Sequence, residues 1–261
     1  MNGWLIYDSV GVKRNEWFIN RLLLQAKSAG LHLQLRTTDE DLFARDLPDF
    51  ALVRTIAPSL SKRLQDSGVR VFNNAKTAEI ANDKYKTYQL CKALDLPVLE
   101  TTDGADLGYP CVVKSVDGHG GAEVFWADDE QAKARAVARL KDRAYIVQKP
   151  CKIIGRDMRV YAIGDRCVGA VLRRSDGDFR SNFSLGGKVE FCHADDSQKA
   201  IVRRLHESLQ FDFVGVDFLP DGTGGWVVNE IEDCAGARML YATSDLDITT
   251  LMIEQIKTEL V

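Results

Sequence analysis

The chain has 261 residues, of which 45% are hydrophobic and 28% are charged, as is usual for a globular protein. Its 34 basic and 38 acidic residues give a formal charge of −4, which argues against a duplex-DNA coat because that function needs a strongly basic face. No apolar run approaches the roughly 18 residues of a membrane span, and the first ten residues lack the basic start of a signal peptide. We therefore expect a cytoplasmic protein without nucleic-acid or membrane partners.

The first third of the chain alternates short apolar strands with helices, a pattern typical of a parallel α/β layer. Gly30 and Gly68 are expected to end two of these helices. Strands are predicted at residues 4–7, 31–35, 50–53 and 69–72, and helices at 18–26 and after Pro58. We assign residues 1–75 to an N-terminal α/β domain.

The rest of the chain divides into a central part, 76–145, and a C-terminal part, 146–261. The central part is predicted to be helical at 74–94, with strands at 111–114, 124–126 and 145–148 and a helix at 129–140 that Asp128 caps. The C-terminal part is predicted to form a long antiparallel sheet with strands at 158–163, 167–172, 189–192, 213–219 and 226–231, a helix at 197–209 and a closing helix.

The cysteines and histidines do not follow the spacing of a metal site. Six cysteines contain no CxxC pair, and four histidines supply no zinc-binding motif. Several cysteines lie in apolar strand-like runs, so we interpret them as reduced core residues rather than disulfides or ligands.

A strand that ends in Lys114 precedes a glycine-rich loop. Gly118, Gly120 and Gly121 would allow backbone N–H groups to approach an anion, and the lysine could reach phosphate oxygens. The loop is neither a Walker A motif nor a dinucleotide fingerprint. A plain hairpin turn with an exposed lysine is the alternative.

Three carboxylates lie in the last two predicted strands. Asp217 interrupts an apolar run, and Glu230 and Glu232 are two residues apart, so they share a face of an extended strand. If these strands pair across the turn at 221–225, Asp217 lies beside them. The repulsion among such carboxylates is relieved by a hard cation such as Mg²⁺ or by a raised pKa. The alternative is a solvated strand end.

A group of arginines could bind phosphate or carboxylate oxygens through bidentate contacts, or could form surface pairs with Asp176 and Asp178. Asp157 could accept ribose hydroxyls or pair with one of these arginines, Arg159. The group consists of Arg156, Arg159, Arg173, Arg174 and Arg180.

Taken together and in this order, the motifs resemble those of the ATP-grasp superfamily, and within it the RimK-like carboxylate–amine ligases, over about residues 73–240. The motifs are Asn73-Asn74, Asn82-Asp83-Lys84, residues 109–114 with the glycine loop, residues 146–148, residues 155–160, residues 177–182 with Gly186-Gly187, residues 215–217 and residues 229–232.

The resemblance implies an ATP-grasp fold, in which an N-terminal α/β layer precedes two α+β subdomains with the nucleotide between them. It implies an ATP- and Mg²⁺-dependent ligase, with Mn²⁺ as a substitute, that forms an amide or peptide bond through an acylphosphate. The substrates would be an amino acid, a peptide or a small metabolite. Two alternatives stay open: an ATP-grasp kinase that stops at phosphorylation, and a non-catalytic nucleotide-binding module. A homo-oligomer is the general expectation for a soluble enzyme.

The resemblance also implies roles for single residues. Lys84 and Lys114 would contact phosphates together with the glycines of the loop, Gly118, Gly120 and Gly121. Gln148, Lys149 and Pro150 would lie at the adenine, and Asp157 would hold the ribose. Arg159, Arg180 and Asn182 would handle the triphosphate, and Asp217, Glu230 and Glu232 would hold Mg²⁺. Arg54 is a candidate for the acceptor side, and Arg238 would either lie near the substrate carboxylate or form a structural ion pair.

Two positions depart from the family pattern. Glu232 stands where the family usually has an asparagine, which adds negative charge to the metal set. Pro150 has no N–H to offer to adenine, so its neighbours would have to recognise the base.

Overall fold

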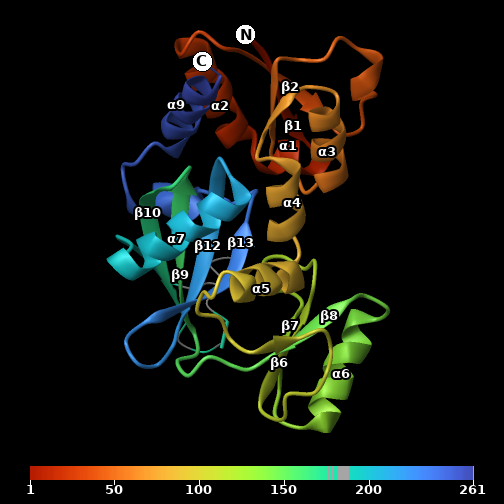
Figure 1. The fold of residues 1–261 in the computed structure, drawn as a ribbon, viewed down its shortest axis with the longest axis vertical. Coiled ribbons are helices and arrows are strands. Elements are labelled where there is room, and N and C mark those ends of the chain that lie inside the picture. Colours follow the sequence, from red (N-terminus) through yellow and green to blue (C-terminus); the bar gives the residue numbers. More distant parts are fainter. Residues whose placement is uncertain (176, 178, 181–187, 261) are drawn as a thin grey trace.

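Three β-sheets organise the computed structural model, which describes residues 1–175, 177, 179–180 and 188–260. The N-terminal sheet lies at one end of the molecule and the central sheet at the other, with the C-terminal sheet between them (Figure 1).

The N-terminal sheet is parallel, with strand order β2-β1-β3-β4, as the alternating pattern predicts. Odd residues of β1 such as Leu5 pack with α2 and α9, and even residues such as Ile6 pack with α3, so helices cover both faces. The elements are β1 Asn2–Tyr7, α1 Ser9–Arg14, α2 Glu16–Ser28, β2 His32–Thr37, η1 Leu42–Ala44, β3 Phe50–Val53, α3 Pro58–Asp66, β4 Arg70–Phe72 and α9 Ile248–Glu259.

Two helices, α4 (Ala75–Ala81) and α5 (Lys84–Ala93), occupy the stretch predicted to be helical at 74–94. Each has its own N-cap: the Asn74 side chain accepts from Thr77 N–H, and the Asp83 side chain accepts from Lys86 N–H, both at 2.8 Å. The break between the helices places Lys84 in the first turn of α5.

The central sheet has the order β5-β8-β6-β7 and is antiparallel throughout, with α6 packed against it. The prediction that Asp128 caps α6 is wrong. Asp129 has the extended backbone of an N-cap and accepts from Ala132 N–H, whereas Asp128 accepts from the Trp126 indole. The elements are β5 Thr101–Thr102, β6 Cys111–Ser115, β7 Val124–Ala127, α6 Glu130–Leu140 and β8 Tyr145–Gln148.

The C-terminal sheet has the order β11-β10-β9-β12-β13, and every neighbouring pair is antiparallel, as predicted. α7 packs on one face, and α8 follows the last strand. The elements are β9 Arg156–Ile163, β10 Arg166–Arg174, β11 Lys188–Cys192, α7 Asp196–Leu209, β12 Phe213–Pro220, β13 Trp226–Glu232 and α8 Arg238–Thr243.

The two-residue period of β9 explains where charge gathers on this sheet. Met158, Val160 and Ala162 face α7 within one apolar cluster. Tyr161 and Ile163 face the other way, into the core shared with the N-terminal layer. Residues 157 and 159 continue that second face, where the core ends, and they are charged. One face of the strand therefore passes from apolar packing to a polar site.

The six cysteines are all free, but only Cys91 and Cys111 are buried as core residues, whereas the other four are partly exposed. Within the described residues, no helix combines the length and apolarity needed to cross a bilayer.

Candidate functional site

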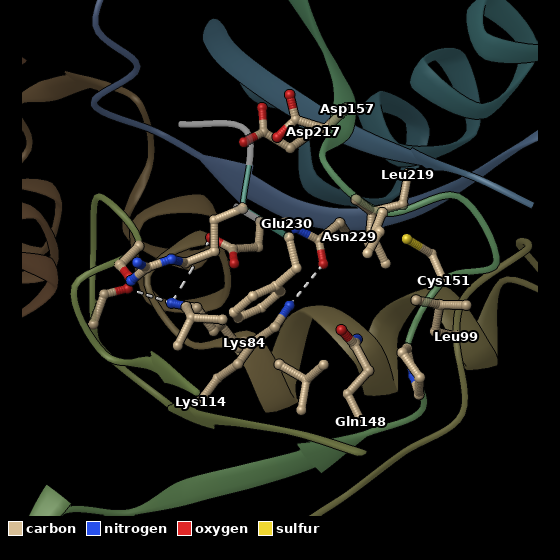
Figure 2. A pocket seen from close by; sticks show the side chains of 18 of the residues that line it. Lys84, Leu99, Lys114, Gln148, Cys151, Asp157, Asp217, Leu219, Asn229 and Glu230 are labelled. Atoms are coloured by element: carbon tan, nitrogen blue, oxygen red, sulfur yellow. Dashed lines mark hydrogen bonds and ion pairs between the residues drawn. The ribbon is translucent and has the colours of Figure 1, made fainter. Parts of the chain in front are cut away.

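A cavity lies between the central and C-terminal sheets, and we call it the inter-sheet cavity (Figure 2). Side chains from α5, β6 to β10, β12 and β13 meet around it. Its lining includes Lys84, Lys114, Gly118, Gly120, Gly121, Trp126, Gln148, Pro150, Cys151, Asp157, Arg173, Arg180, Asp217, Asn229, Glu230 and Glu232.

Two lysines from different elements enter this cavity. Lys114 Nζ donates to Asn229 Oδ1 at 2.9 Å, and Lys84 Nζ lies 3.7 Å from Glu230 Oε2 (Figure 2). Lys114 is only 6% exposed, so the alternative of a turn with an exposed lysine is wrong. Burial lowers the pKa of Lys114, Glu230 opposes that shift, and the charge of Lys84 adds to it. A bound polyanion would stabilise the charged form of Lys114.

The glycine loop between β6 and β7 is held beside these lysines. Gly120 and Gly121 have positive φ angles of 70° and 77°, which glycine adopts without a steric penalty. Lys84 Nζ donates to Gly118 O, and Arg180 Nη1 donates to Gly121 O at 2.9 Å. The loop therefore presents its backbone to the cavity from a fixed position.

A bulge in β13 turns two consecutive side chains into the cavity. Phe218 pairs with Val228, but Asp217 pairs with Glu230, so Asn229 is the extra residue. Val228 and Ile231 are three positions apart and yet both pack in the α7 cluster, which the bulge makes possible. Asp217 lies directly opposite Glu230, and both glutamates line the cavity, as predicted.

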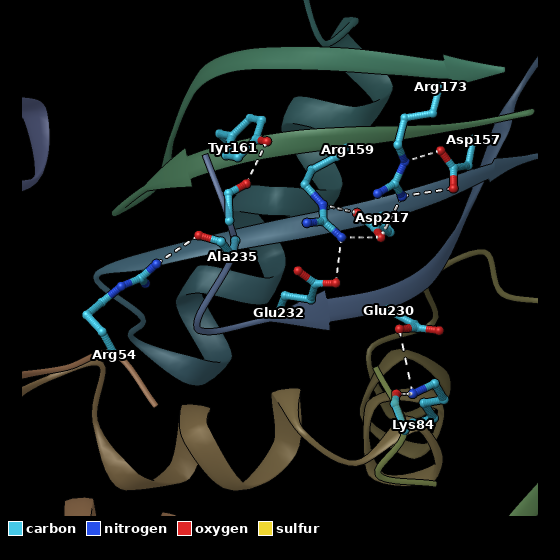
Figure 3. Close-up of polar contacts among 12 residues, drawn as sticks. Arg54, Lys84, Asp157, Arg159, Tyr161, Arg173, Asp217, Glu230, Glu232 and Ala235 are labelled. Atoms are coloured by element: carbon cyan, nitrogen blue, oxygen red, sulfur yellow. Dashed lines mark hydrogen bonds and ion pairs between the residues drawn. The ribbon is translucent and has the colours of Figure 1, made fainter. Parts of the chain in front are cut away.

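Arginines from β9 and β10 face these acids (Figure 3). Arg159 Nε and Nη2 donate to Asp217 Oδ1 and Oδ2 at 2.7 and 2.8 Å, and Arg159 Nη2 also donates to Glu232 at 2.5 Å. Arg173 Nη2 donates to Asp217 Oδ2 and to Asp157 Oδ2, each at 2.8 Å. We call this set the arginine–carboxylate network.

Asp157 therefore pairs with Arg173, its register partner on β10, and not with Arg159 as one of the two alternatives above has it. Arg174 fits the alternative of a surface ion pair, because it is exposed and its Nη2 lies 3.8 Å from Oε2 of exposed Glu190. Asp176 and Asp178, the surface partners considered above, lie outside the described residues.

The network shifts the proton equilibria of its members. Burial alone would raise the pKa of Asp217, but Arg159 and Arg173 outweigh burial and hold that pKa well below its usual range. For Glu232, burial dominates and raises the pKa in spite of Arg159. In the part of the chain that the structure describes, no three His, Cys, Asp or Glu side chains form a ready metal site. The oxygens of Asp217, Glu230 and Glu232 are nevertheless the hard donors that suit Mg²⁺.

The segment expected at adenine splits between two environments. Gln148 and Pro150 line the cavity, and Gln148 Nε2 donates to Thr101 Oγ1 at 3.0 Å. Lys149 points elsewhere: its ammonium donates to Leu107 O, and its N–H donates to Glu100 O at 2.9 Å. Asn182 lies outside the described residues.

A second cavity, of about 400 Å³, adjoins the first and shares Gly120, Arg173 and Glu232 with it. It lies beside the N-terminal layer, and its further lining includes Tyr7, Arg14, Trp17, Phe18, Arg54, Ile56, His119, Arg159, Asp233, Cys234, Arg238 and Tyr241.

Both residues expected on the acceptor side line this second cavity. Arg54 is buried, and it donates to the carbonyls of Asp233 and Ala235 at 3.1 and 2.8 Å, so it holds the loop after β13 (Figure 3). Arg238 is exposed and donates to Arg14 O at 2.6 Å.

Several lining residues have no motif that would single them out. Cys151 directly follows Pro150, Trp126 is an ordinary strand residue, and Trp17 occurs in an amphipathic helix. Asn229 is the exception, because the sequence does carry a signal for it. Val228 and Ile231 are three positions apart, which breaks the two-residue alternation of a strand and so indicates the bulge at Asn229.

Comparison with known proteins gives consistent matches. Residues 81–256 match the RimK-like ATP-grasp domain family. The chain is 30% identical to human N-acetylaspartylglutamate synthase A over 243 residues, which are 84% of this chain and 62% of that protein. It is 31% identical over 208 residues to the "Probable alpha-L-glutamate ligase" of Sodalis glossinidius (strain morsitans), covering 74% of this chain and 70% of that protein.

The solved structure of D-cycloserine synthetase DcsG has the same fold, with a TM-score of 0.78 at 18% identity over the whole of both chains. The expected fold class is thereby confirmed. The chain spans about three fifths of the length of the human synthase.

Proposed function

Because the chain belongs to the RimK-like ATP-grasp family, we propose that it is an ATP-dependent ligase that joins a carboxylate to an amine. The main support is that Lys84 and Lys114 meet Glu230 and Asn229 in one cavity, although more than 100 residues separate the two pairs in sequence. Phosphoryl transfer needs positioning and charge neutralisation rather than a protein nucleophile, and this cavity supplies both.

In the first step, a carboxylate oxygen of one substrate forms a bond to the γ-phosphorus of ATP, and the bond to ADP breaks. Lys84 and Lys114 bring two positive charges to the phosphates, and the backbone of Gly118, Gly120 and Gly121 approaches them without side chains in the way. Gln148 and Pro150 would contact the adenine at the other end of the cavity. The product of this step is an acylphosphate.

Asp217, Glu230 and Glu232 would hold Mg²⁺, which when bound neutralises phosphate charge. Arg159 and Arg173 keep Asp217 ionised and fix its position. Arg180 reaches the glycine loop, and we assign it with Asn182 to the reacting phosphoryl group.

In the second step, the amine nitrogen forms a bond to the acyl carbon, the bond from that carbon to the phosphate oxygen breaks, and inorganic phosphate leaves. The amine loses its proton to water or to a nearby base. We place the amine in the second cavity, because that cavity adjoins the inter-sheet cavity through Gly120, Arg173 and Glu232. The substrates are small molecules or peptides.

The test is product analysis with Mg²⁺–ATP, carboxylates and amines, comparing wild type with Glu230→Gln. We expect ADP, phosphate and an amide from wild type, and a loss of at least a hundredfold in turnover from Glu230→Gln. Glu190→Gln, an exposed glutamate of the same sheet, is the control. A stable phosphorylated product would instead support the kinase alternative, and ATP turnover unaffected by Glu230→Gln would contradict the proposed site.

A further inference from the structure

Two aromatic side chains form a fixed platform at the edge of the second cavity. Trp17 of α2 and Tyr241 of α8 meet edge to face, with ring centroids 4.9 Å apart. The Arg21 guanidinium lies 5.1 Å from the Trp17 ring and 5.6 Å from the Tyr241 ring. Asp247 anchors the platform, because it pairs with Arg21 and accepts from the Tyr241 hydroxyl at 2.7 Å. The rings are therefore positioned before any ligand arrives.

Trp17 is unusual because it remains 56% exposed although it lines a cavity. Phe18, Ile56 and Met239 also line this cavity. A large exposed aromatic beside other apolar side chains favours a ligand with a flat apolar group, since its burial removes both surfaces from water.

The charge around the same cavity is mainly positive. Five arginines and two acidic residues line it. Of the acids, Glu232 is paired with Arg159, and Asp233 accepts from Asn82 Nδ2 at 3.1 Å. Both acids therefore already have partners within the folded chain.

Arg14 and Arg238 are the exposed arginines of this lining, and among the described residues neither forms an ion pair. Their segments are in contact, because Arg238 Nη2 donates to the backbone carbonyl of Arg14. Two exposed guanidiniums without carboxylate partners fit a ligand carboxylate. Arg159 and Arg173, by contrast, are occupied within the arginine–carboxylate network.

We infer that the second cavity binds an amino acid with an aromatic side chain as the amine substrate, with its carboxylate at Arg14 and Arg238 and its ring against Trp17 and Tyr241. That this ligand is a substrate rests on the proposed function, whereas its binding to the second cavity can be measured without turnover. The amine nitrogen bonds to the acyl carbon, phosphate leaves that carbon, and the amine proton passes to solvent.

Calorimetry of the full chain with Mg²⁺ and ADP tests the site, with L-phenylalanine, L-leucine, L-glutamate and 2-phenylethylamine as probes. We expect L-phenylalanine to bind at least tenfold more tightly than L-glutamate or L-leucine. The amine probe, which lacks a carboxylate, should bind more weakly than L-phenylalanine. Tighter binding of L-glutamate, or no binding of L-phenylalanine, would overturn the inference.

Variants separate the ring contact from the carboxylate contact. Trp17→Ala should weaken L-phenylalanine binding at least tenfold, and Trp17→Phe should restore most of it. Leu24→Ala removes another exposed apolar side chain of α2, 61% exposed, and should change the affinity less than twofold. Unchanged affinity in Trp17→Ala would overturn the ring contact.

Arg238→Ala should weaken binding of L-phenylalanine at least fivefold but leave that of 2-phenylethylamine within twofold. An equal loss for both probes would contradict the assigned carboxylate contact. ADP release is followed separately with the same probes and a panel of carboxylates. Binding of L-phenylalanine without any ADP release would overturn the ligase proposal but support the aromatic site. Amide formation with L-glutamate alone would support the ligase proposal but overturn the aromatic site.

Discussion

Arg159 and Asp217 are register partners on neighbouring strands, and their side chains form a two-bond ion pair at 2.7 and 2.8 Å. Arg173 contacts the second oxygen of the same aspartate, and Glu232 contacts the same guanidinium. Acids and arginines thus alternate through this network, whose members line one or both cavities. Because Asp217 has two arginine partners, the network keeps this candidate metal ligand ionised and in place before substrates bind.

Removal of Arg159 should destabilise the protein strongly. Arg159→Ala leaves buried Asp217 and half-buried Glu232 with less compensation, so we expect the free energy of unfolding to fall by about 3 kcal/mol or more. Urea unfolding measures this change. The control is Arg174→Ala on β10, whose pair with Glu190 is exposed and should contribute less than about 1 kcal/mol. Equal losses in the two variants would show that the network contributes no special stability.

The pair between Arg70 and Asp212 should give the stability a specific pH dependence. It joins the N-terminal layer to the C-terminal sheet, with two contacts to the Asp212 carboxylate. Burial raises the pKa of Asp212 from 3.8 to about 6, although Arg70 opposes the shift. Between those values the folded chain holds a proton that the unfolded chain has lost, so this group's contribution to stability decreases as the pH rises from about 4 to about 6.

The difference of about 2 pKa units corresponds to about 3 kcal/mol. Urea unfolding of wild type and Asp212→Asn at a series of pH values measures it. We expect the stability of wild type relative to the variant to decrease across this window. Asp66→Asn, at an exposed aspartate of α3, controls for the loss of a surface charge. Parallel curves for wild type and Asp212→Asn would refute the prediction.

Nucleotide should protect one cysteine from alkylation. Cys151 lines the inter-sheet cavity and is partly exposed, and its pKa is raised mainly by burial, so reaction with iodoacetamide should be slow but measurable. We expect Mg²⁺–ADP to slow alkylation of Cys151 at least fivefold, as followed by peptide mass spectrometry. Cys192 is also partly exposed but lies on edge strand β11, so its rate should not change. Equal protection of both thiols, or of neither, would argue against a nucleotide at Cys151.

The sequence was sufficient for the longer helices and strands and for most of the inter-sheet cavity, but not for the short elements α1, η1 and β5. Strand alternation placed Glu230 and Glu232 on one face, and the glycine loop after Lys114 indicated residues that line the inter-sheet cavity. These features are local, so their spacing reveals them.

Other features depend on contacts between distant segments. The pairing of Arg173 with Asp157 follows from the register between β9 and β10, which strand patterns alone do not give. The second cavity combines residues from Tyr7 to Tyr241, and Trp17 has the pattern of a surface residue on its own helix. The observed N-cap of α6 is one residue later than the predicted one. Asp128 and Asp129 are both suitable N-cap residues, but Asp128 accepts a hydrogen bond from the Trp126 indole instead.

The most direct test of the account is calorimetric titration of Mg²⁺–ADP into wild type, Lys114→Met and Lys92→Met. Lys114→Met keeps most of the length of the buried side chain but removes its charge, and Lys92 is an exposed lysine on α5. We predict that wild type and Lys92→Met bind with the same affinity and that Lys114→Met binds at least tenfold more weakly. No heat of binding with wild type, or equal affinity for all three proteins, would contradict a nucleotide site between the central and C-terminal sheets.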